Sequence, residues 1–289
     1  MLIRTLAIGL VLASAPMATA LAQTAVAATS PSQAPSFETS HVLVPAPDGR
    51  TIDMSIWTAP DERGVIVFST GIQSSAIAYR RILSAWVAHG YTVVAPLHVD
   101  APDHPHRDDY DRRSAFVTRI MDVAVARGFA RATHPGKPII AAGHSFGSLM
   151  SMIEGGAGTV AGLHGDPDLK GIIAFSSAGV IPGVVTPKTY ETMTAPMLLI
   201  TGDKDLVPGF VTDWQDHRAG FDGSPAGDKT LMVFHDADHQ FVVRADDADF
   251  ALVVEATEDF LDAYALGDAA AKARLAALPA PDGVTIERR

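Results

Sequence analysis

The chain has 289 residues, of which 47% are hydrophobic and 19% are charged, a balance that suits one folded domain and excludes a disordered polymer. The formal net charge of -11 disfavours binding to nucleic acid or to an anionic membrane surface, because like charges repel. The absence of cysteine excludes disulfide bonds, thiolate metal sites and a cysteine-linked lipid anchor.

The first segment has the pattern of a secretory signal peptide. Arg4 precedes the apolar run Leu6–Ala13, and small residues lead to Ala20-Leu21-Ala22. The alternative is a membrane anchor, but the run is shorter than the roughly 20 residues that span a bilayer, and Pro16 interrupts it. We expect residues 1–22 to be cleaved after Ala22, with Ala27 as the second choice. The mature protein is then expected in the periplasm or outside the cell, without a membrane anchor.

A flexible leader is expected over residues 23–36, followed by a single domain over residues 37–289. In this domain short apolar runs alternate with longer helical patterns, which is typical of βαβ units. We predict an α/β fold with a mostly parallel sheet of eight strands, helices on both faces, and an antiparallel edge at the first two strands. The predicted strands are His41–Val44, Ile52–Trp57, Val65–Phe68, Thr92–Ala95, Pro138–Ala142, Ile172–Phe175, Met197–Ile200 and Leu231–Phe234.

Helices are predicted where apolar residues recur at helical spacing between these strands. The three clearest stripes run from Tyr79 to Val87, from Phe116 to Ala124 and from Phe250 to Tyr264, and a short Ala-rich helix follows before Pro279. Each stripe is one apolar face laid on the sheet, so these residues are interpreted as ordinary core.

The pentapeptide Gly143-His144-Ser145-Phe146-Gly147 is the most informative motif. A bare Gly-x-Ser-x-Gly also arises by chance, so its context decides. Here it directly follows the predicted strand Pro138–Ala142 and precedes a helix that carries Leu149 and Met150. In such a strand-turn-helix unit the serine lies on a tight turn, and the helix start supplies N–H groups that stabilise an oxyanion.

A serine hydroxyl becomes a nucleophile only beside a histidine base and a carboxylate that orients it. The strand Met197–Ile200 leads into Thr201-Gly202-Asp203-Lys204-Asp205, which offers Asp203 and Asp205 as the acid. The strand Leu231–Phe234 leads into His235-Asp236-Ala237-Asp238-His239, which offers His235 and His239 as the base. Serine, acid and histidine therefore follow one another in this order.

From Val65 to Phe241 the chain resembles the α/β-hydrolase superfamily through these three motifs. In that superfamily the acid usually ends a Gly-x-x-Asp turn, which implies Asp205. The histidine usually lies two residues before an aromatic residue, which implies His239 ahead of Phe241. The resemblance thus implies a triad of Ser145, His239 and Asp205, and it implies no metal and no organic cofactor.

The same resemblance places an oxyanion hole at the backbone N–H groups of Phe146 and Ile72. Ile72 belongs to the loop Ser69-Thr70-Gly71-Ile72-Gln73, where many relatives carry His-Gly in place of Thr70-Gly71. We expect Gly71 to permit the unusual turn of this loop. Gly71 and Gln73 are candidate substrate contacts, and His144 is expected to be packed or hydrogen-bonded behind the serine.

His98 is the third candidate substrate contact, in the loop over residues 97–109 after the fourth strand. This loop is rich in His and Asp, so metal binding is an alternative, but its two prolines and mixed spacing match no defined ligand pattern. We therefore expect a polar loop that lines the pocket.

Only a short interval separates Ser177 from the strand at Met197, where the superfamily usually inserts a lid, so no large cap is predicted. An open site resembles dienelactone hydrolases, platelet-activating-factor acetylhydrolase-like proteins and bacterial polyester hydrolases. This resemblance implies hydrolysis of a small-molecule or polymeric ester through an acyl-enzyme. The alternatives are an amidase, peptidase or acyltransferase with the same triad, haloperoxidase-like or lyase chemistry, and a secreted non-catalytic binding protein on this fold.

Overall fold

The computed structural model describes residues 39–159, 162–163, 165–181 and 184–289. The expected signal peptide and leader, residues 1–36, lie outside these described residues. Cleavage after Ala22, export and the domain boundary at residue 37 therefore stay predictions. Within the described residues, no helix is both long enough and apolar enough to cross a membrane.

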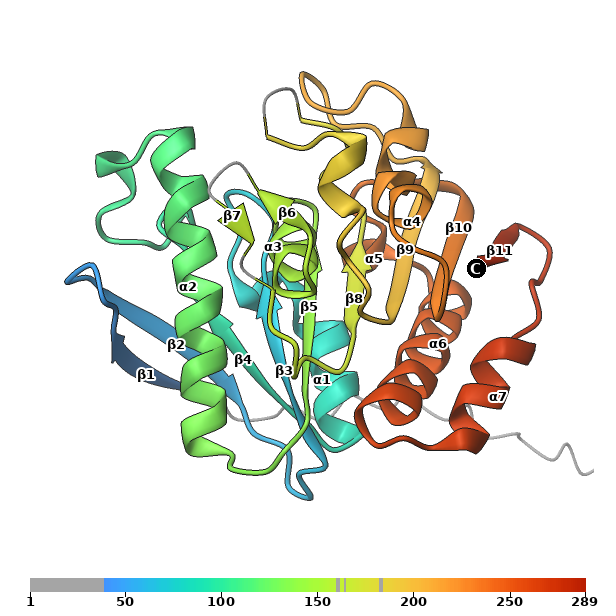
Figure 1. The fold of residues 1–289 in the computed structure, drawn as a ribbon, viewed down its shortest axis with the longest axis horizontal. Helices are drawn as coiled ribbons and strands as arrows, with labels where there is room; N and C mark the ends of the chain where they lie inside the picture. Colours follow the sequence, from blue (N-terminus) through green and yellow to red (C-terminus); the bar gives the residue numbers. More distant parts are fainter. Residues whose placement is uncertain (1–38, 160–161, 164, 182–183) are drawn as a thin grey trace, which may run out of the picture. The chain divides into compact units, whose positions relative to one another are not determined.

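A nine-stranded sheet lies at the centre of the described residues (Figure 1). Six of its strands, β3, β4, β5, β8, β9 and β10, run parallel to one another, and β1, β2 and β11 are antiparallel to their neighbours. All eight predicted strands are present, and β11 is a ninth that was not predicted. In sheet order the strands are β1 Thr39–Pro45, β2 Thr51–Trp57, β4 Tyr91–Pro96, β3 Gly64–Ser69, β5 Ile139–His144, β8 Ile172–Phe175, β9 Met197–Lys204, β10 Lys229–Asp238 and β11 Val284–Arg288.

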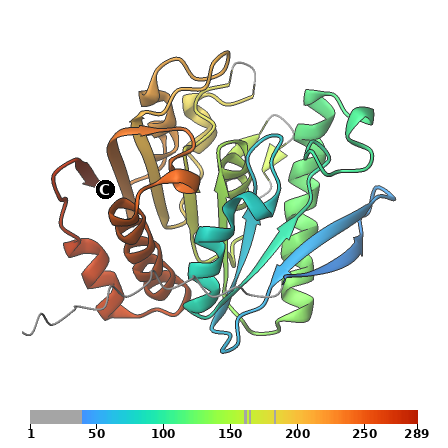
Figure 2. The same ribbon diagram turned by 180° about the vertical axis from the view of Figure 1, so that it is seen from behind.

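Helices cover both faces of the sheet, as predicted. Figure 1 shows α2 and α3 on the near face, and Figure 2 shows α1 and α6 on the other. The helices are α1 Arg80–Ala88, α2 Arg112–Thr133, α3 Phe146–Glu154, α4 Ala219–Gly223, α5 Phe241–Arg244, α6 Asp247–Ala265 and α7 Ala269–Ala277. Shorter elements are the hairpin β6 Gly158–Thr159 with β7 Gly162–Leu163 and the 3-10 helices Ala76–Tyr79, Arg107–Asp109, Pro187–Tyr190 and Trp214–Arg218.

Alternation along the strands divides the apolar side chains between two cores. On β5, Ile140 and Ala142 join the cluster under α1 and α6, whereas Ile139 and Ala141 join the cluster under α2 and α3. Successive side chains of a strand point to opposite faces, so a strand covered on both faces is apolar throughout. This is why the central strands read as unbroken apolar runs.

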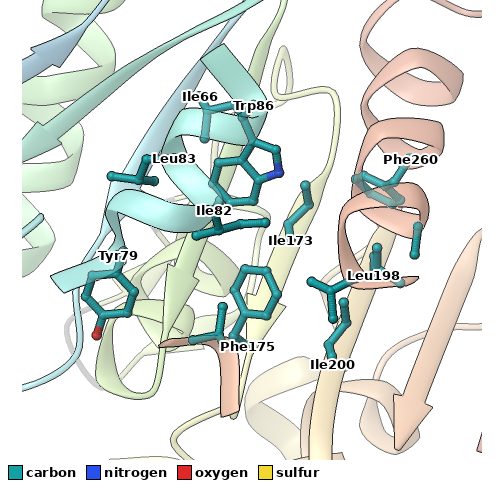
Figure 3. Packing of buried hydrophobic residues seen from close by; sticks show 14 of the residues in the cluster. Ile66, Tyr79, Ile82, Leu83, Trp86, Ile173, Phe175, Leu198, Ile200 and Phe260 are labelled. Atoms are coloured by element: carbon teal, nitrogen blue, oxygen red, sulfur yellow. The ribbon is translucent and has the colours of Figure 1, made fainter. Parts of the chain in front are cut away.

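Trp86 is the largest fully buried side chain in the cluster under α1 and α6 (Figure 3). It is fully buried, its ring stacks on Phe175 with centroids 6.2 Å apart, and its Nε1–H donates to Thr257 Oγ1 at 3.1 Å. A buried indole N–H that lacked an acceptor would cost free energy, so this hydrogen bond fixes α1 against α6. The sheet and its two helical layers thus form a rigid base for the loops at its edge.

No large cap is present in the described residues between β8 and β9. The only regular element there is the 3-10 helix Pro187–Tyr190. The residues that follow β5, β9 and β10 therefore reach the carboxyl edge of the sheet without a lid domain above them. This edge is where ligands bind in open α/β sheets.

Candidate active site

Ser145 lies on a strained turn between β5 and α3. Its backbone has φ 55° and ψ -121°, a conformation that is rare for a residue with a side chain. The glycines on either side of Ser145 permit this turn, because a side chain at either position would collide with neighbouring backbone atoms. A Cβ on Gly147 would lie 2.0 Å from the Ser69 carbonyl oxygen, and one on Gly143 would lie 2.4 Å from the backbone of Gly147. The strand and the helix therefore converge on the serine as the motif predicts.

A chain of hydrogen bonds joins Ser145, His239 and Asp205. His239 Nε2 is 2.9 Å from Ser145 Oγ, and His239 Nδ1 is 2.6 Å from Asp205 Oδ1. Asp205 is fully buried, whereas the side chain of His239 keeps 16% of its surface exposed. Burial alone would raise the pKa of Asp205, but hydrogen bonds from His217 and His239 hold this pKa far below its usual range. Asp205 is thus a buried carboxylate in its charged form.

The sheet brings the three residues together because β5, β8, β9 and β10 are consecutive neighbours in it. Asp205 is the residue directly after β9, and His239 is the residue directly after β10. The register between β9 and β10 shifts between Phe234 and Asp238, and the extended end of β10 carries His239 toward the serine.

The other acid and histidine candidates from the sequence lie elsewhere. Asp203 Oδ1 accepts the backbone N–H of Asp236 at 2.7 Å, so Asp203 shapes the end of β10. His235 Nε2 is 3.3 Å from Thr285 Oγ1 on β11. The structure therefore brings Asp205 and His239 to Ser145 and leaves Asp203 and His235 apart from it.

His217 is a second histidine on the Asp205 carboxylate, and the sequence analysis missed it. It lies in the 3-10 helix Trp214–Arg218, is fully buried, and places Nε2 2.8 Å from Asp205 Oδ1. No motif marks His217, because its contact with Asp205 depends on the path of the loop between them.

Asp205, His217 and His239 have ligand-capable atoms within 4.8 Å of one another, the only such group of three among the described residues. Their atoms are already joined by hydrogen bonds. A metal ion would have to displace the protons that join them. The geometry therefore fits a proton-linked cluster.

The predicted oxyanion donors lie beside the serine. Ile72 and Phe146 line the same cavity as Ser145. Phe146 is the first residue of α3, where backbone N–H groups have no acceptor within the helix. Within the described part of the chain, neither the Ile72 nor the Phe146 N–H makes a hydrogen bond. Both donors are therefore available to a ligand.

Gly71 has a role that differs from the expected one. Its φ is not left-handed, and Gln73 instead adopts φ 55°. A Cβ on Gly71 would lie 3.0 Å from both His144 Nδ1 and the hydroxyl oxygen of Tyr79, so the glycine permits close approach. The Gly71 N–H donates to that hydroxyl oxygen at 3.0 Å. Gly71 and Gln73 both line the cavity, and their contact with a substrate stays a prediction.

Arg119 of α2 holds the loop over residues 69–73, which carries Ile72 and which we name the oxyanion loop. It is fully buried, and it donates to the carbonyl oxygen of Thr70 at 2.7 Å and to that of Gly71 at 2.9 Å. It also pairs with Asp100 at 2.7 Å, and the other oxygen of Asp100 accepts the Gln73 N–H at 2.8 Å. Arg119 and Asp100 thus fix the loop on both sides of Ile72, and the sequence analysis identified neither.

His144 lies behind the serine, as expected. Its Nε2–H donates to the backbone carbonyl of His239 at 2.8 Å, and its Nδ1 is 2.9 Å from the Tyr79 hydroxyl. Burial and the nearby His239 lower the pKa of His144 to about 3. His144 is therefore a neutral link that positions the main chain of His239.

The prediction that His98 contacts the substrate is wrong. Its side chain is fully buried and does not line the cavity. Nε2 lies 2.9 Å from Ser69 Oγ, and Nδ1 lies 2.9 Å from Asp122 Oδ2. These two partners satisfy the imidazole inside the protein, so His98 supports the end of β3 beneath the oxyanion loop.

A cavity of about 690 Å³ opens beside Ser145. Its lining includes polar residues besides Ser145 and His239, among them Gln73, Arg112 and Arg113, but most of the exposed wall is apolar. The apolar residues that form the wall include Phe116, Phe146, Ile181, Val184, Phe210 and Val211. A site of this kind binds an apolar group and orients it through a few polar contacts.

No family model and no curated protein matches the chain. Solved structures match it at low identity. The esterase domain of a Rhodothermus marinus protein has a TM-score of 0.56 and 16% identity over 79% of this chain and 99% of that chain. A Pyrococcus furiosus esterase has a TM-score of 0.59 and 15% identity over 79% of this chain and 92% of that one.

A peptidase also shares the fold. The Pyrococcus horikoshii acylaminoacyl peptidase has a TM-score of 0.57 and 14% identity over 79% of this chain, which spans 42% of the peptidase. Structures of esterases and of a peptidase thus resemble this chain in fold. The described residues have the α/β-hydrolase fold, as the sequence motifs predicted.

Proposed function

We propose that the protein is a serine hydrolase that cleaves carboxylic esters through an acyl-enzyme. The observation that carries the proposal is the hydrogen-bonded chain from Ser145 through His239 to Asp205. It lies beside the backbone N–H groups of Ile72 and Phe146, which have no acceptor among the residues that the structure describes. Nucleophile, base and orienting acid are the parts that acyl transfer needs.

The reaction begins when His239 Nε2 takes the proton of Ser145 and the serine oxygen attacks the ester carbonyl carbon. The N–H groups of Ile72 and Phe146 donate to the negative oxygen of the tetrahedral intermediate. Asp205 accepts the Nδ1–H of His239 and stabilises the imidazolium. His239 then donates its proton to the leaving alcohol, and water attacks the acyl-enzyme by the same route in reverse.

The largely apolar wall of the cavity supports the proposal that an uncharged acyl group of the ester binds there. Each methylene that leaves water for this wall contributes about 0.8 kcal/mol, or about fourfold in kcat/KM. We expect kcat/KM for p-nitrophenyl esters to rise by about this factor per methylene from acetate upward, until the cavity is full. Anilides of the same acids are expected to react far more slowly.

A series of soluble esters of increasing acyl length, measured beside the matching anilides, tests the proposal. Rates that stay at the background level across the ester series would refute ester hydrolysis. Anilide rates that equal or exceed the ester rates would favour the amidase or peptidase alternative.

The contacts of Arg119 with the oxyanion loop lead to a second prediction. Arg119→Met removes the donors to Thr70 and Gly71, so the Ile72 N–H loses its fixed direction. We expect kcat to fall by about 10- to 100-fold, because a displaced oxyanion donor stabilises the transition state less. KM is expected to change much less.

Arg127 on the same helix provides the matched control. Arg127 pairs with Glu154 and Asp166, away from the oxyanion loop. Both Arg127→Met and Arg119→Met should lower the melting temperature, but Arg127→Met should leave kcat within about threefold of wild type. Equal kcat losses in both variants would mean that Arg119 acts only through overall stability.

A further inference from the structure

The surroundings of His217 show that both of its ring nitrogens face oxygen acceptors. Nε2 lies 2.8 Å from the carboxylate oxygen Oδ1 of Asp205 and 2.9 Å from the backbone carbonyl oxygen of the same residue. Nδ1 lies against the backbone carbonyl oxygen of Ser177. A carbonyl oxygen cannot donate a hydrogen bond, so each nitrogen must carry its own proton to make these contacts.

A neutral imidazole has one N–H, and one of its nitrogens would turn a lone pair toward a buried oxygen. That arrangement costs free energy, because neither group could find water in a site with no exposed surface. Burial alone would lower the pKa of His217, but the hydrogen bond and the charge of Asp205 outweigh it and raise the pKa. Geometry and electrostatics therefore agree on an imidazolium.

His217 is the positively charged partner of Asp205. No lysine or arginine pairs with Asp205 among the described residues, and the remaining oxygen of Asp205 accepts from Thr201 Oγ1 at 2.7 Å. His144, near His239 on the other side, is neutral because its pKa is lowered to about 3. On the 3-10 helix of His217, Arg218 pairs with Asp222 and Glu287.

We propose that His217 is a positioning residue whose positively charged ring compensates the buried charge of Asp205 and holds this carboxylate in place for His239. This inference rests on the proposed function. The rings of His217 and His239 are 5.8 Å apart, so the two positive charges would repel one another. Removal of the His217 charge would therefore remove this repulsion.

His217 also links the triad to the wall of the cavity. The Ser177 hydroxyl donates to the His217 backbone carbonyl at 2.8 Å, and the His217 ring donates to the Ser177 carbonyl. Ser177 follows β8 and lines the cavity. The His217 imidazolium thus joins the loop that carries Asp205 to the loop after β8 that lines the cavity.

The test is the pH profile of kcat/KM for His217→Gln, which keeps an N–H donor for Asp205 and removes the charge. We expect the acidic limb of the profile to move to higher pH by about one unit, from a unit charge at this distance in a partly screened site. The plateau at alkaline pH should fall by less than about tenfold, because the catalytic groups remain. His235→Gln, which changes an exposed histidine beside Thr285, should leave the profile unmoved.

An independent readout is the ¹⁵N chemical shift of the His217 ring in the wild-type protein. Two protonated nitrogens around neutral pH are expected, and this measurement does not depend on any activity. A neutral His217 ring, or an unmoved acidic limb in a folded His217→Gln variant, would overturn the proposal. If no ester is hydrolysed, the function proposed above fails, and the ¹⁵N spectrum still decides whether His217 carries the charge.

Discussion

Ser145→Ala is expected to reduce kcat/KM for ester hydrolysis by about 10⁵- to 10⁶-fold, which leaves only the residual rate that oxyanion donors and substrate binding supply. The loss should be this large because the alanine methyl group can neither attack the carbonyl nor accept the acyl group. The fold should survive, since among the described residues the partly exposed Ser145 hydroxyl makes a hydrogen bond only with His239. Steady-state rates beside circular dichroism and melting curves would measure both effects.

Ser151→Ala is the matched control for this variant. Ser151 lies in α3, six residues beyond the nucleophile, and its hydroxyl donates to the Gly147 carbonyl at 3.2 Å inside the helix. We expect its activity to stay within about threefold of wild type. Labelling by a fluorophosphonate should persist in Ser151→Ala and disappear in Ser145→Ala. Activity of Ser145→Ala within tenfold of wild type would remove Ser145 as the nucleophile.

The central strands and the order of the site residues could be predicted because both depend on local sequence. A strand buried on both faces must be apolar along its whole length, as Ile139 to Ala142 are. The residue after each such strand reaches the carboxyl edge, so Ser145, Asp205 and His239 could be placed near one another without knowledge of any distance.

β11 was missed because its sequence carries little of this signal. In Val284–Arg288 only Val284 is buried, and the strand forms by pairing with the edge of β10. A strand that is stabilised mainly by backbone hydrogen bonds to an existing edge leaves little hydrophobic pattern in its own residues.

The supporting residues of the site could not be predicted, because each acts through contacts between segments distant in the chain. Arg119 looks like one more charged residue of a helix, yet it is fully buried beneath Thr70 and Gly71. His98 lies in the expected loop, but Ser69 and Asp122 bind both of its nitrogens and turn it away from the cavity. No residue of the loop over residues 97–109 lines the cavity beside Ser145, and the buried hydrogen-bond partners of His98 hold its ring beneath β3.

Gly147→Ala is expected to be the most destabilising of the single-methyl changes considered for this site. The new Cβ would lie 2.0 Å from the Ser69 carbonyl oxygen and 2.5 Å from that of Thr70. Both contacts are with backbone, so no side chain can rotate away and α3 must separate from β3. We expect the free energy of unfolding to fall by about 3 kcal/mol or more, beyond the usual cost of an overpacked core.

Gly128→Ala adds the same methyl group to a helix and provides the control. Gly128 lies in α2 with no atom within 4 Å of the position that its Cβ would take. Alanine there should stabilise the protein by about 0.5–1 kcal/mol through helix propensity alone. Urea unfolding of both variants measures the two effects, which have opposite signs. A Gly147→Ala protein as stable as wild type would mean that α3 and β3 can separate, and the strained geometry of Ser145 would then not depend on their close approach.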